Sequence, residues 1–230
     1  DFLQYLTKTE VEQGERFRAE AVLEEIEMLS SGGELDDRTI VSFTINFKPN
    51  QTEFSAVQYA AEFTRVIETA DKFGNAVVAI RGHADPTKTL IDLIKAGNAK
   101  GTLRRTGTRG NYSYSLNGRP LKLNDTARLV KAIEAGDFDG VDEHNPRQTM
   151  QAALNLSRKR ADAVKKSVIA YAKGKGIAVD LSQIQPQGVG IAEPFIAKPS
   201  SAAEAEQNMR VEFRLIRVSA EVTQESDFDF

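Results

Sequence analysis

The fold is decided by the stretch Val77-Val78-Ala79-Ile80-Arg81-Gly82-His83-Ala84-Asp85, in which an apolar run ends in glycine, histidine and then aspartate. A run that is apolar on both faces is typical of a strand whose sheet is covered on both sides. We therefore predict a buried strand that carries Asp85 just past its carboxyl end, which is where open α/β sheets bind ligands. Gly82 would allow a sharp turn or the close approach of a ligand.

The residues before this strand predict a β-α-β unit. Apolar and polar residues alternate over 41–47, which is the period of a half-buried strand. An apolar stripe at helical spacing predicts a helix over 54–72, with Ser55 opening a capping box and Gly74 ending the helix. Residues 39 to 83 would then cross over right-handed, with their two strands parallel.

The C-terminal part of the sequence adds three elements. A long helix is predicted to begin with Pro146 in its first turn, where proline is favoured, and two strands are predicted over 184–189 and 209–215. The result is an α/β domain in the order β-α-β-α-β-β. It is preceded by a helix and linker over 1–38 and followed by an acidic tail over 219–230.

Residues 88 to 145 interrupt this domain, which as a whole spans residues 39 to 218. About 60 residues are too many for a structureless loop in a compact domain, so we interpret them as an inserted subdomain. Its predicted parts are a short helix over 90–96, a hairpin around Asn117-Gly118, and a helix capped by Asn124 or Asp125.

A basic run from Lys100 to Arg109 lies in this insertion, close to Tyr112 and Tyr114. It is a candidate contact for a glycan or a protein partner, although a solvated surface is the more common explanation of such a run. The whole chain has a net charge of −3, which gives no overall attraction to nucleic acid or acidic membranes. We therefore predict no nucleic-acid partner.

Composition excludes several kinds of site. The 230 residues include no cysteine, which rules out disulfides, a thiolate metal site and a cysteine nucleophile. The two histidines, His83 and His144, do not stand at metal-ligand spacing, so no metal site is predicted. No apolar run approaches the roughly 20 residues of a membrane span. Because the chain starts at Asp1 and not at methionine, we expect a processed protein or a fragment of a longer one.

The candidate partner of Asp85 is Arg160, which lies on the predicted long helix. An arginine side chain can bind a carboxylate through two parallel hydrogen bonds. Taken alone, Asp85 is more often a residue that caps a turn through Thr87 or the following amides, and Arg160 is more often solvated or paired with a surface acid. His83 is interpreted as a packed histidine. Because there is no nucleophile elbow, phosphate loop or acid pair, and Gly188-Val189-Gly190 lacks the rest of a dinucleotide fingerprint, we predict neither an enzyme nor a cofactor.

Four motifs stand in a recognisable order: Gly82-His83-Ala84-Asp85, then Leu156-Ser157-Arg158-Lys159-Arg160-Ala161-Asp162-Ala163-Val164, then Gly188-Val189-Gly190 through Glu193-Pro194, then Asn208-Met209-Arg210-Val211-Glu212. In them the sequence resembles the OmpA C-terminal-like domain, the peptidoglycan-binding module of outer-membrane proteins, peptidoglycan-associated lipoproteins and flagellar stator B subunits. The resemblance covers about residues 39 to 87 and 146 to 218. It implies a β-α-β-α-β-β two-layer sandwich with a mixed sheet.

The resemblance also implies a function. The expected site is non-catalytic and binds the peptide stem of peptidoglycan at its diaminopimelate residue, so that a larger protein is anchored to the wall in the periplasm or cell envelope of a Gram-negative-type bacterium. Asp85 matches the aspartate that meets the ligand's ammonium group, and Arg160 matches the arginine that meets its carboxylate. Three further matched positions are Thr87, Asn50 and Arg210.

The sequence departs from the family pattern at three motif positions. Ala84 replaces a threonine, Ala153 replaces an asparagine that contacts the ligand, and Met209 replaces the first arginine of the last motif. The insertion also follows Asp85 directly and could cover, extend or block the pocket. These departures leave a second hypothesis, in which the fold is a protein-interaction scaffold with a degenerate pocket and residues 88 to 145 contact another envelope protein.

Overall fold

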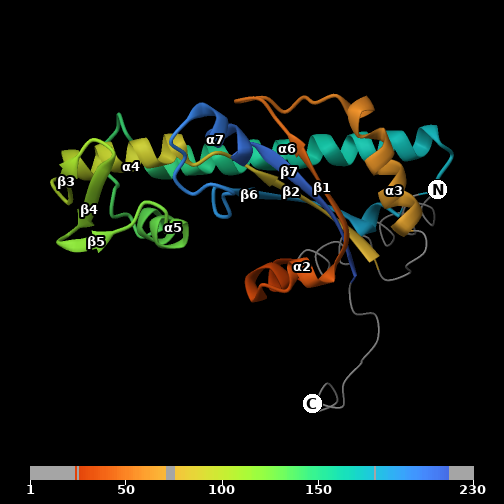
Figure 1. Ribbon diagram of the computed structural model, residues 1–230, viewed down its shortest axis with the longest axis horizontal. Coiled ribbons are helices and arrows are strands. Elements are labelled where there is room, and N and C mark those ends of the chain that lie inside the picture. Colours follow the sequence, from red (N-terminus) through yellow and green to blue (C-terminus); the bar gives the residue numbers. More distant parts are fainter. Residues whose placement is uncertain (1–23, 25, 71–75, 179, 218–230) are drawn as a thin grey trace, which may run out of the picture.

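A four-stranded mixed sheet forms the centre of the chain in this computed structural model, which describes residue 24 and residues 26–70, 76–178 and 180–217 (Figure 1). The strand order is β1-β7-β2-β6, with bounds β1 Thr39–Asn46, β7 Arg210–Arg217, β2 Ala76–His83 and β6 Ile184–Gly190. β7 is antiparallel to β1 and to β2, and β6 is parallel to β2. The strands β1 and β2 therefore run in the same direction, as predicted, but β7 lies between them.

Two helices cover one face of the sheet, namely α3 (Ala60–Ala70) and α6 (Pro146–Gly174). They bury one apolar core with the sheet, whose members include Phe63, Val66, Val78, Ile80, Ala161, Val164, Phe213 and Leu215. Pro146 occupies the first turn of α6, and the side chain of Asn145 caps it by accepting from the Gln148 N–H. The element order is thus the predicted β-α-β-α-β-β order, which confirms the fold class.

The other face of β2 is covered by the N-terminal segment. Residues 26–32 are helical, and a short helix α2 spans Leu35–Arg38. Ile26 and Leu35 bury their side chains with Val77, Ala79 and Ile216 of the sheet. Because both faces are covered, every residue of β2 is buried, as its apolar run predicts. The rest of the predicted N-terminal helix and the acidic tail lie outside the described residues.

The start of the second element differs from the prediction. A 3-10 helix, η1, spans Ala56–Tyr59 before α3 begins at Ala60. The side chain of Ser55 makes no capping bond, and only its main-chain carbonyl accepts from the Gln58 N–H. The predicted capping box is therefore wrong, because a tighter main-chain turn takes its place. Gly74, the predicted end of the helix, lies outside the described residues.

Residues 88 to 145 fold largely as a unit at one end of α6, away from α3 (Figure 1). The helix α4 spans Thr87–Ala99, a three-stranded sheet has the order β3-β4-β5, and α5 spans Thr126–Glu134 with Asp125 as its cap. The strands are β3 Leu103–Thr108, β4 Asn111–Leu116 and β5 Arg119–Leu121. A separate apolar core fills this unit, with Leu93, Leu103, Leu129, Ile133 and Phe138 among its members.

The predicted hairpin is confirmed by the backbone at its turn, where Asn117 has φ 49° and Gly118 has φ 79°. Two positive φ angles in succession are what a two-residue hairpin turn needs. The strand β3 was not predicted, because the basic run that forms it has little apolar alternation beyond Leu103.

The last helix, α7 (Ala202–Asn208), also escaped prediction. It is seven residues long, and the hydroxyl of Ser201 caps it by accepting from the Glu204 N–H. It leads directly into β7 and so fixes where that strand begins. In the part of the chain that the structure describes, no helix has both the length and the apolar character that a membrane span requires.

Candidate functional site

A pocket of about 360 Å³ lies at the carboxyl end of β2. Its walls come from the loop after β1, the residues that follow β2, the start of α4 and the N-terminal half of α6. Four of the five predicted site residues line it, namely Asn50, Asp85, Thr87 and Arg160. The topology therefore brings together residues that are far apart in the sequence.

Asp85 is held in place from two sides. Its Oδ2 accepts from the Thr87 N–H at 3.0 Å, which is the turn-capping bond that the sequence allowed, and its Oδ1 accepts from Nδ2 of Asn208 at 3.1 Å. Asn208 is fully buried, and its amide also bonds both main-chain polar groups of Ile196. Among the described residues no cation pairs with Asp85, so its charge is oriented but not neutralised.

Arg160 is fully buried and holds the floor of the pocket together. Its Nε donates to the carbonyl of Gln51 at 2.9 Å and its Nη2 to that of Lys48 at 3.2 Å. Its Nη1 donates to the carbonyl of His83 at 3.0 Å, and the guanidinium lies over the ring of Phe47 at 5.3 Å. The loop after β1 is thereby tied to the end of β2.

The charge of Arg160 has no carboxylate partner among the described residues, since the three groups it binds are neutral carbonyls. Burial lowers the pKa of Arg160 to about 10, which leaves it charged at neutral pH. The predicted partners Asp85 and Arg160 thus line one pocket without forming an ion pair with each other.

Two more lining residues offer polar groups. The hydroxyl of Thr87 is buried and has no hydrogen-bond partner among the described residues. Asn50 has φ 59°, a left-handed conformation that asparagine tolerates, and this places it at the turn beside the pocket.

The structure does not bring Arg210 to this pocket. Its Nε and Nη2 bond Oε1 of Glu212 at 3.1 and 2.6 Å. The reason is the alternation of side chains along a strand, since the preceding Met209 lines the pocket and the next residue points to the opposite face. Arg210 lines a different depression, together with Glu212 and Arg214.

All three departures from the family pattern, Ala84, Ala153 and Met209, line the pocket. They replace polar side chains by apolar ones in the pocket lining. From the insertion, α4 contributes Lys88 and Ile91 to the lining. The first helix of the insertion therefore forms a wall of the pocket.

Gly82 has a different role from the predicted one. It lies within β2, and a Cβ at this position would come 1.9 Å from the carbonyl oxygen of Ser157 on α6. The hydroxyl of Ser157 in turn accepts from the Gly190 N–H at 2.9 Å. Gly82 is thus needed for the contact between β2 and α6, not for a turn or a ligand.

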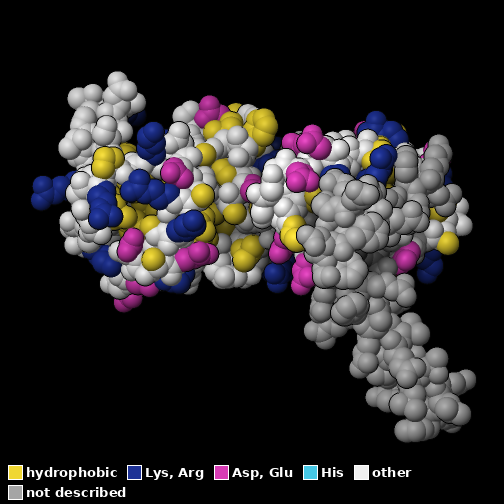
Figure 2. All heavy atoms as spheres, turned by 90° about the horizontal axis from the view of Figure 1, so that it is seen from below, with side chains coloured by type: hydrophobic (Ala, Val, Ile, Leu, Met, Phe, Trp, Pro, Cys, Tyr) yellow, Lys and Arg dark blue, Asp and Glu magenta, His cyan; other side chains and the backbone are white. Residues whose placement is uncertain are grey.

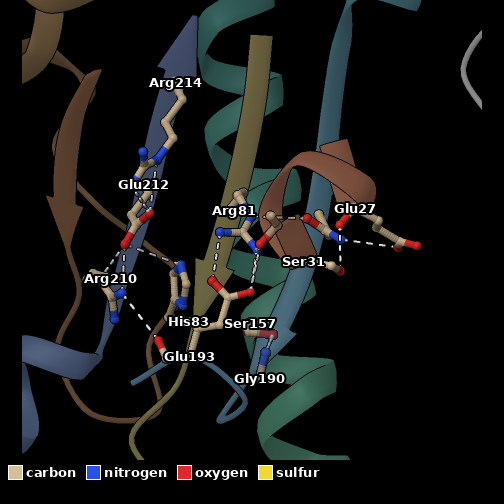
Figure 3. Close-up of polar contacts among 12 residues, drawn as sticks. Glu27, Ser31, Arg81, His83, Ser157, Gly190, Glu193, Arg210, Glu212 and Arg214 are labelled. Carbon is tan, nitrogen blue, oxygen red and sulfur yellow. Dashed lines mark hydrogen bonds and ion pairs between the residues drawn. The ribbon is translucent and has the colours of Figure 1, made fainter. Parts of the chain in front are cut away.

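A partly buried polar network lies on the opposite face of the sheet (Figure 3). Arg81 donates from Nη1 and Nη2 to the carboxylate of Glu193 at 2.8 and 2.7 Å, and Ser30 bonds both side chains. These contacts hold the loop after β6 and the N-terminal segment against the sheet. The sequence did not predict this pair, although an arginine in a buried strand is a sign that a partner exists.

His83 belongs to the same face and is packed, with 1% of its surface exposed and no hydrogen bond to either ring nitrogen among the described residues. Burial, together with the charge of Arg210, lowers the pKa of His83 to about 3 against the opposing effect of Glu212. Its Nε2 lies 3.6 Å from Oε1 of Glu212. At neutral pH the histidine is therefore uncharged.

This pKa makes stability depend on pH. The unfolded chain binds a proton at His83 near pH 6.5 and the folded chain only near pH 3, so acid favours unfolding between these values. We expect the free energy of unfolding to fall by roughly 1 kcal/mol per pH unit through this group below pH 6.5. Urea unfolding from about pH 7 to pH 5 would show a flatter dependence of the unfolding free energy on pH for His83→Gln than for wild type. Equal slopes in wild type and His83→Gln would contradict this assignment.

The fold and the pocket define an α/β domain of β-α-β-α-β-β order with an aspartate and an arginine in one pocket. No family model matches the chain, and no curated protein matches it. It is similar to the peptidoglycan-associated lipoprotein from Burkholderia pseudomallei, with 14% identity over 75% of this chain and 88% of that chain and a TM-score of 0.40. It is also similar to the periplasmic domain of Helicobacter pylori MotB (13%, 77% and 83%, TM-score 0.39) and to a putative MotB-like protein from Desulfovibrio vulgaris (13%, 92% and 99%, TM-score 0.38).

Within the described residues, no group of three or more His, Cys, Asp or Glu side chains is placed to hold a metal ion.

Proposed function

We propose that the pocket binds the peptide stem of peptidoglycan at its diaminopimelate residue, without catalysis, and so anchors a larger protein to the wall in the bacterial periplasm. The observation that carries this proposal is the buried, uncompensated guanidinium of Arg160 in one pocket with the oriented carboxylate of Asp85. A fixed cation and a fixed anion in one pocket are complementary to a ligand that carries one carboxylate and one ammonium group.

Arg160 keeps donors for such a ligand. A guanidinium has five N–H groups, and three of them donate to main-chain carbonyls. One N–H on each Nη is left to meet a carboxylate. Each oxygen of Asp85 accepts one bond and retains a lone pair for an ammonium group. The unpartnered hydroxyl of Thr87 adds a further polar contact.

The composition of the pocket supports binding without catalysis. Its lining contains one carboxylate, Asp85, and no histidine. A pair of carboxylates or a histidine base is therefore not offered by the lining residues. The apolar side chains of Ala84, Ala153 and Met209 suit the methylene chain that links the peptide backbone to the distal carbon of diaminopimelate, which carries both the free ammonium and the free carboxylate.

The proposal is tested by co-sedimentation with purified sacculi of the diaminopimelate type. Asp85→Asn keeps the size of the side chain and removes its charge, so we expect binding to weaken about 30-fold or more. Asp162→Ala, on α6 but outside the pocket, is the matched control and should pellet as wild type does.

Sacculi that carry lysine in place of diaminopimelate lack the terminal carboxylate, so we expect them to bind more weakly. A wild-type chain that stays in the supernatant, or a folded Asp85→Asn variant that pellets as well as wild type, would contradict the proposal.

Restoring the family's amide should strengthen binding. Ala153→Asn places a donor and acceptor in the pocket wall, and one net hydrogen bond of about 0.5–1.5 kcal/mol corresponds to roughly 2- to 12-fold tighter binding. Sedimentation with a titration of sacculi would measure this gain. Ala152→Asn, one residue earlier and also lining the pocket, is the control and should leave the affinity within about twofold. The same gain in both variants would show that the position of the amide does not matter.

A further inference from the structure

The insertion concentrates positive charge in a chain that is acidic overall. Between residues 93 and 124 there are seven Lys and Arg residues and no acidic one, whereas the whole chain has a net charge of −3. All seven side chains are exposed, namely Lys95, Lys100, Arg104, Arg105, Arg109, Arg119 and Lys122. No ion pair joins any of them to a carboxylate of the described residues. Figure 2 shows several Lys and Arg side chains over this end of the molecule.

A groove of about 760 Å³ runs beside this basic sheet. One wall comes from β4, β5 and the residues that follow β5, and the other from residues 196–198 of the loop after β6. Its lining combines apolar and aromatic side chains with two lysines and no acid: Tyr112, Tyr114, Pro120, Leu121, Leu123, Ile196, Ala197, Lys122 and Lys198 among them.

The strand register places one arginine on the groove side and its neighbour on the other. Arg105 pairs with Tyr114, and Tyr114 pairs with Leu121, so these three side chains share a face. Arg104 is one residue away and points to the opposite face. The guanidinium of Arg105 lies 4.2 Å from the centre of the Tyr112 ring, which fixes a planar cation at the tyrosine end of the groove.

The far wall of the groove is rigid. Ile196 is held by Asn208 through both its N–H and its carbonyl at 2.9 Å, and Asn208 is fully buried. A wall that is already ordered loses little conformational entropy when a ligand binds.

We propose that this groove binds an extended acidic peptide segment of another protein. Leucine and aromatic side chains of the segment would contact Tyr114, Pro120 and Ile196, and its carboxylates would meet Arg105, Lys122 and Lys198. Charge complementarity favours such a segment because the groove offers cations and no anion. The site is separate from the pocket of Asp85 and does not depend on peptidoglycan binding.

The geometry favours a peptide over two other polyanions. A membrane surface meets protruding residues, whereas these apolar side chains line a depression. Single-stranded nucleic acid needs free aromatic faces for its bases. Here Arg105 covers Tyr112, and Tyr114 packs against the core of the insertion.

The test is fluorescence anisotropy of the full chain with a labelled octapeptide of alternating Glu and Leu or Phe residues. The variant Arg105→Glu with Lys122→Glu changes the cation held over the lining Tyr112 ring and a cation of the lining itself, and we expect it to weaken binding at least about 10-fold. The control, Arg104→Glu with Lys95→Glu, changes the net charge equally at exposed positions outside the groove lining and should weaken binding no more than about twofold. Co-sedimentation with sacculi should be unchanged in both double variants, which separates this site from the proposed wall-binding pocket.

Three results would overturn the proposal. One is an equal loss of binding in both double variants, which would indicate that the peptide responds to the overall positive charge of the insertion and not to the groove. Another is unchanged affinity for the same octapeptide with Gln in place of Glu. The third is tighter binding of anionic phospholipid vesicles or of an oligonucleotide than of the acidic peptide.

Discussion

Gly82→Ala is expected to lower the free energy of unfolding by about 3 kcal/mol or more, which for a chain of this size corresponds to a fall in Tm of roughly 6–12 °C. The added methyl group would lie 1.9 Å from the carbonyl oxygen of Ser157 and 3.4 Å from the Cβ of Ala161. A backbone carbonyl within a helix cannot rotate away, so α6 as a whole must move back from β2. Thermal unfolding followed by circular dichroism would measure the effect.

The same shift should reach the candidate site. Arg160 lies one turn beyond Ser157 on α6, and its guanidinium is fixed to the carbonyl of His83, the residue after Gly82. When α6 moves away from β2, the hydrogen bond between Arg160 and the carbonyl of His83 lengthens, and the floor of the pocket loses this contact. We therefore expect Gly82→Ala to bind sacculi more weakly even at temperatures where it is folded.

Gly174→Ala is the matched control. Gly174 is the last residue of α6, and a Cβ there would meet nothing within 4 Å. Alanine in place of a helical glycine is expected to leave stability unchanged or raise it by up to about 1 kcal/mol. If Gly82→Ala unfolds at the wild-type temperature, the close approach of α6 to β2 is not a constraint on this fold.

Periodicity was enough to predict the main elements of the fold. The alternation before Phe47, the apolar run before Asp85 and the stripe that begins at Pro146 each correspond to an observed element. Such patterns record which face of an element is buried, and burial is what the sheet and α6 require. Elements that bury few side chains have no periodic apolar pattern and were therefore not predicted. The strand β3 is exposed beyond Leu103, and α7 has only Asn208 buried.

The site was predicted only in part, for a related reason. The motif resemblance indicated Asn50, Asp85, Thr87 and Arg160, and the structure places all four around one pocket. It could not indicate what each residue contacts. Asn208 holds Asp85 from the end of α7, just before β7, and this bond depends on the register of β7 with β2, which no local pattern specifies.

Arg210 shows most directly that a sequence motif does not specify where a side chain points. The motif joined Met209 and Arg210 as neighbours, but a strand sends neighbours to opposite faces. Met209 therefore reaches the pocket, and Arg210 bonds Glu212 on the far side. A motif position can be occupied by a matching residue type while the side chain belongs to another part of the fold.

Arg160→Met is expected to lower both the stability of the fold and the binding of sacculi. The loss of stability should be seen even without a ligand. The substitution keeps a long side chain in the same space but removes every donor to the carbonyls of Lys48, Gln51 and His83. Hydrogen bonds from a charged group contribute about 1.5–3 kcal/mol each, and the exposed loop carbonyls can recover part of this from water. We expect the free energy of unfolding to fall by about 3–5 kcal/mol in urea titrations. Arg158→Met, an exposed arginine on the same helix, should change it by less than about 0.5 kcal/mol.

Arg160 thus both stabilises the fold and contributes to the proposed binding site. Experiments can therefore distinguish its contribution from that of Asp85 by measuring stability and binding together. Asp85→Asn should remove binding at a smaller cost in stability than a change at Arg160, because asparagine can still accept from the Thr87 N–H, although its NH2 group then faces the donor Nδ2 of Asn208. Arg160→Met should remove binding at reduced stability, and Arg160→Lys should keep the positive charge while losing the fork that reaches three carbonyls at once. A variant at Arg160 with wild-type stability would show that its contacts with the loop after β1 do not hold the pocket floor. Its guanidinium would then serve the ligand alone, although the structure gives it three partners before any ligand arrives.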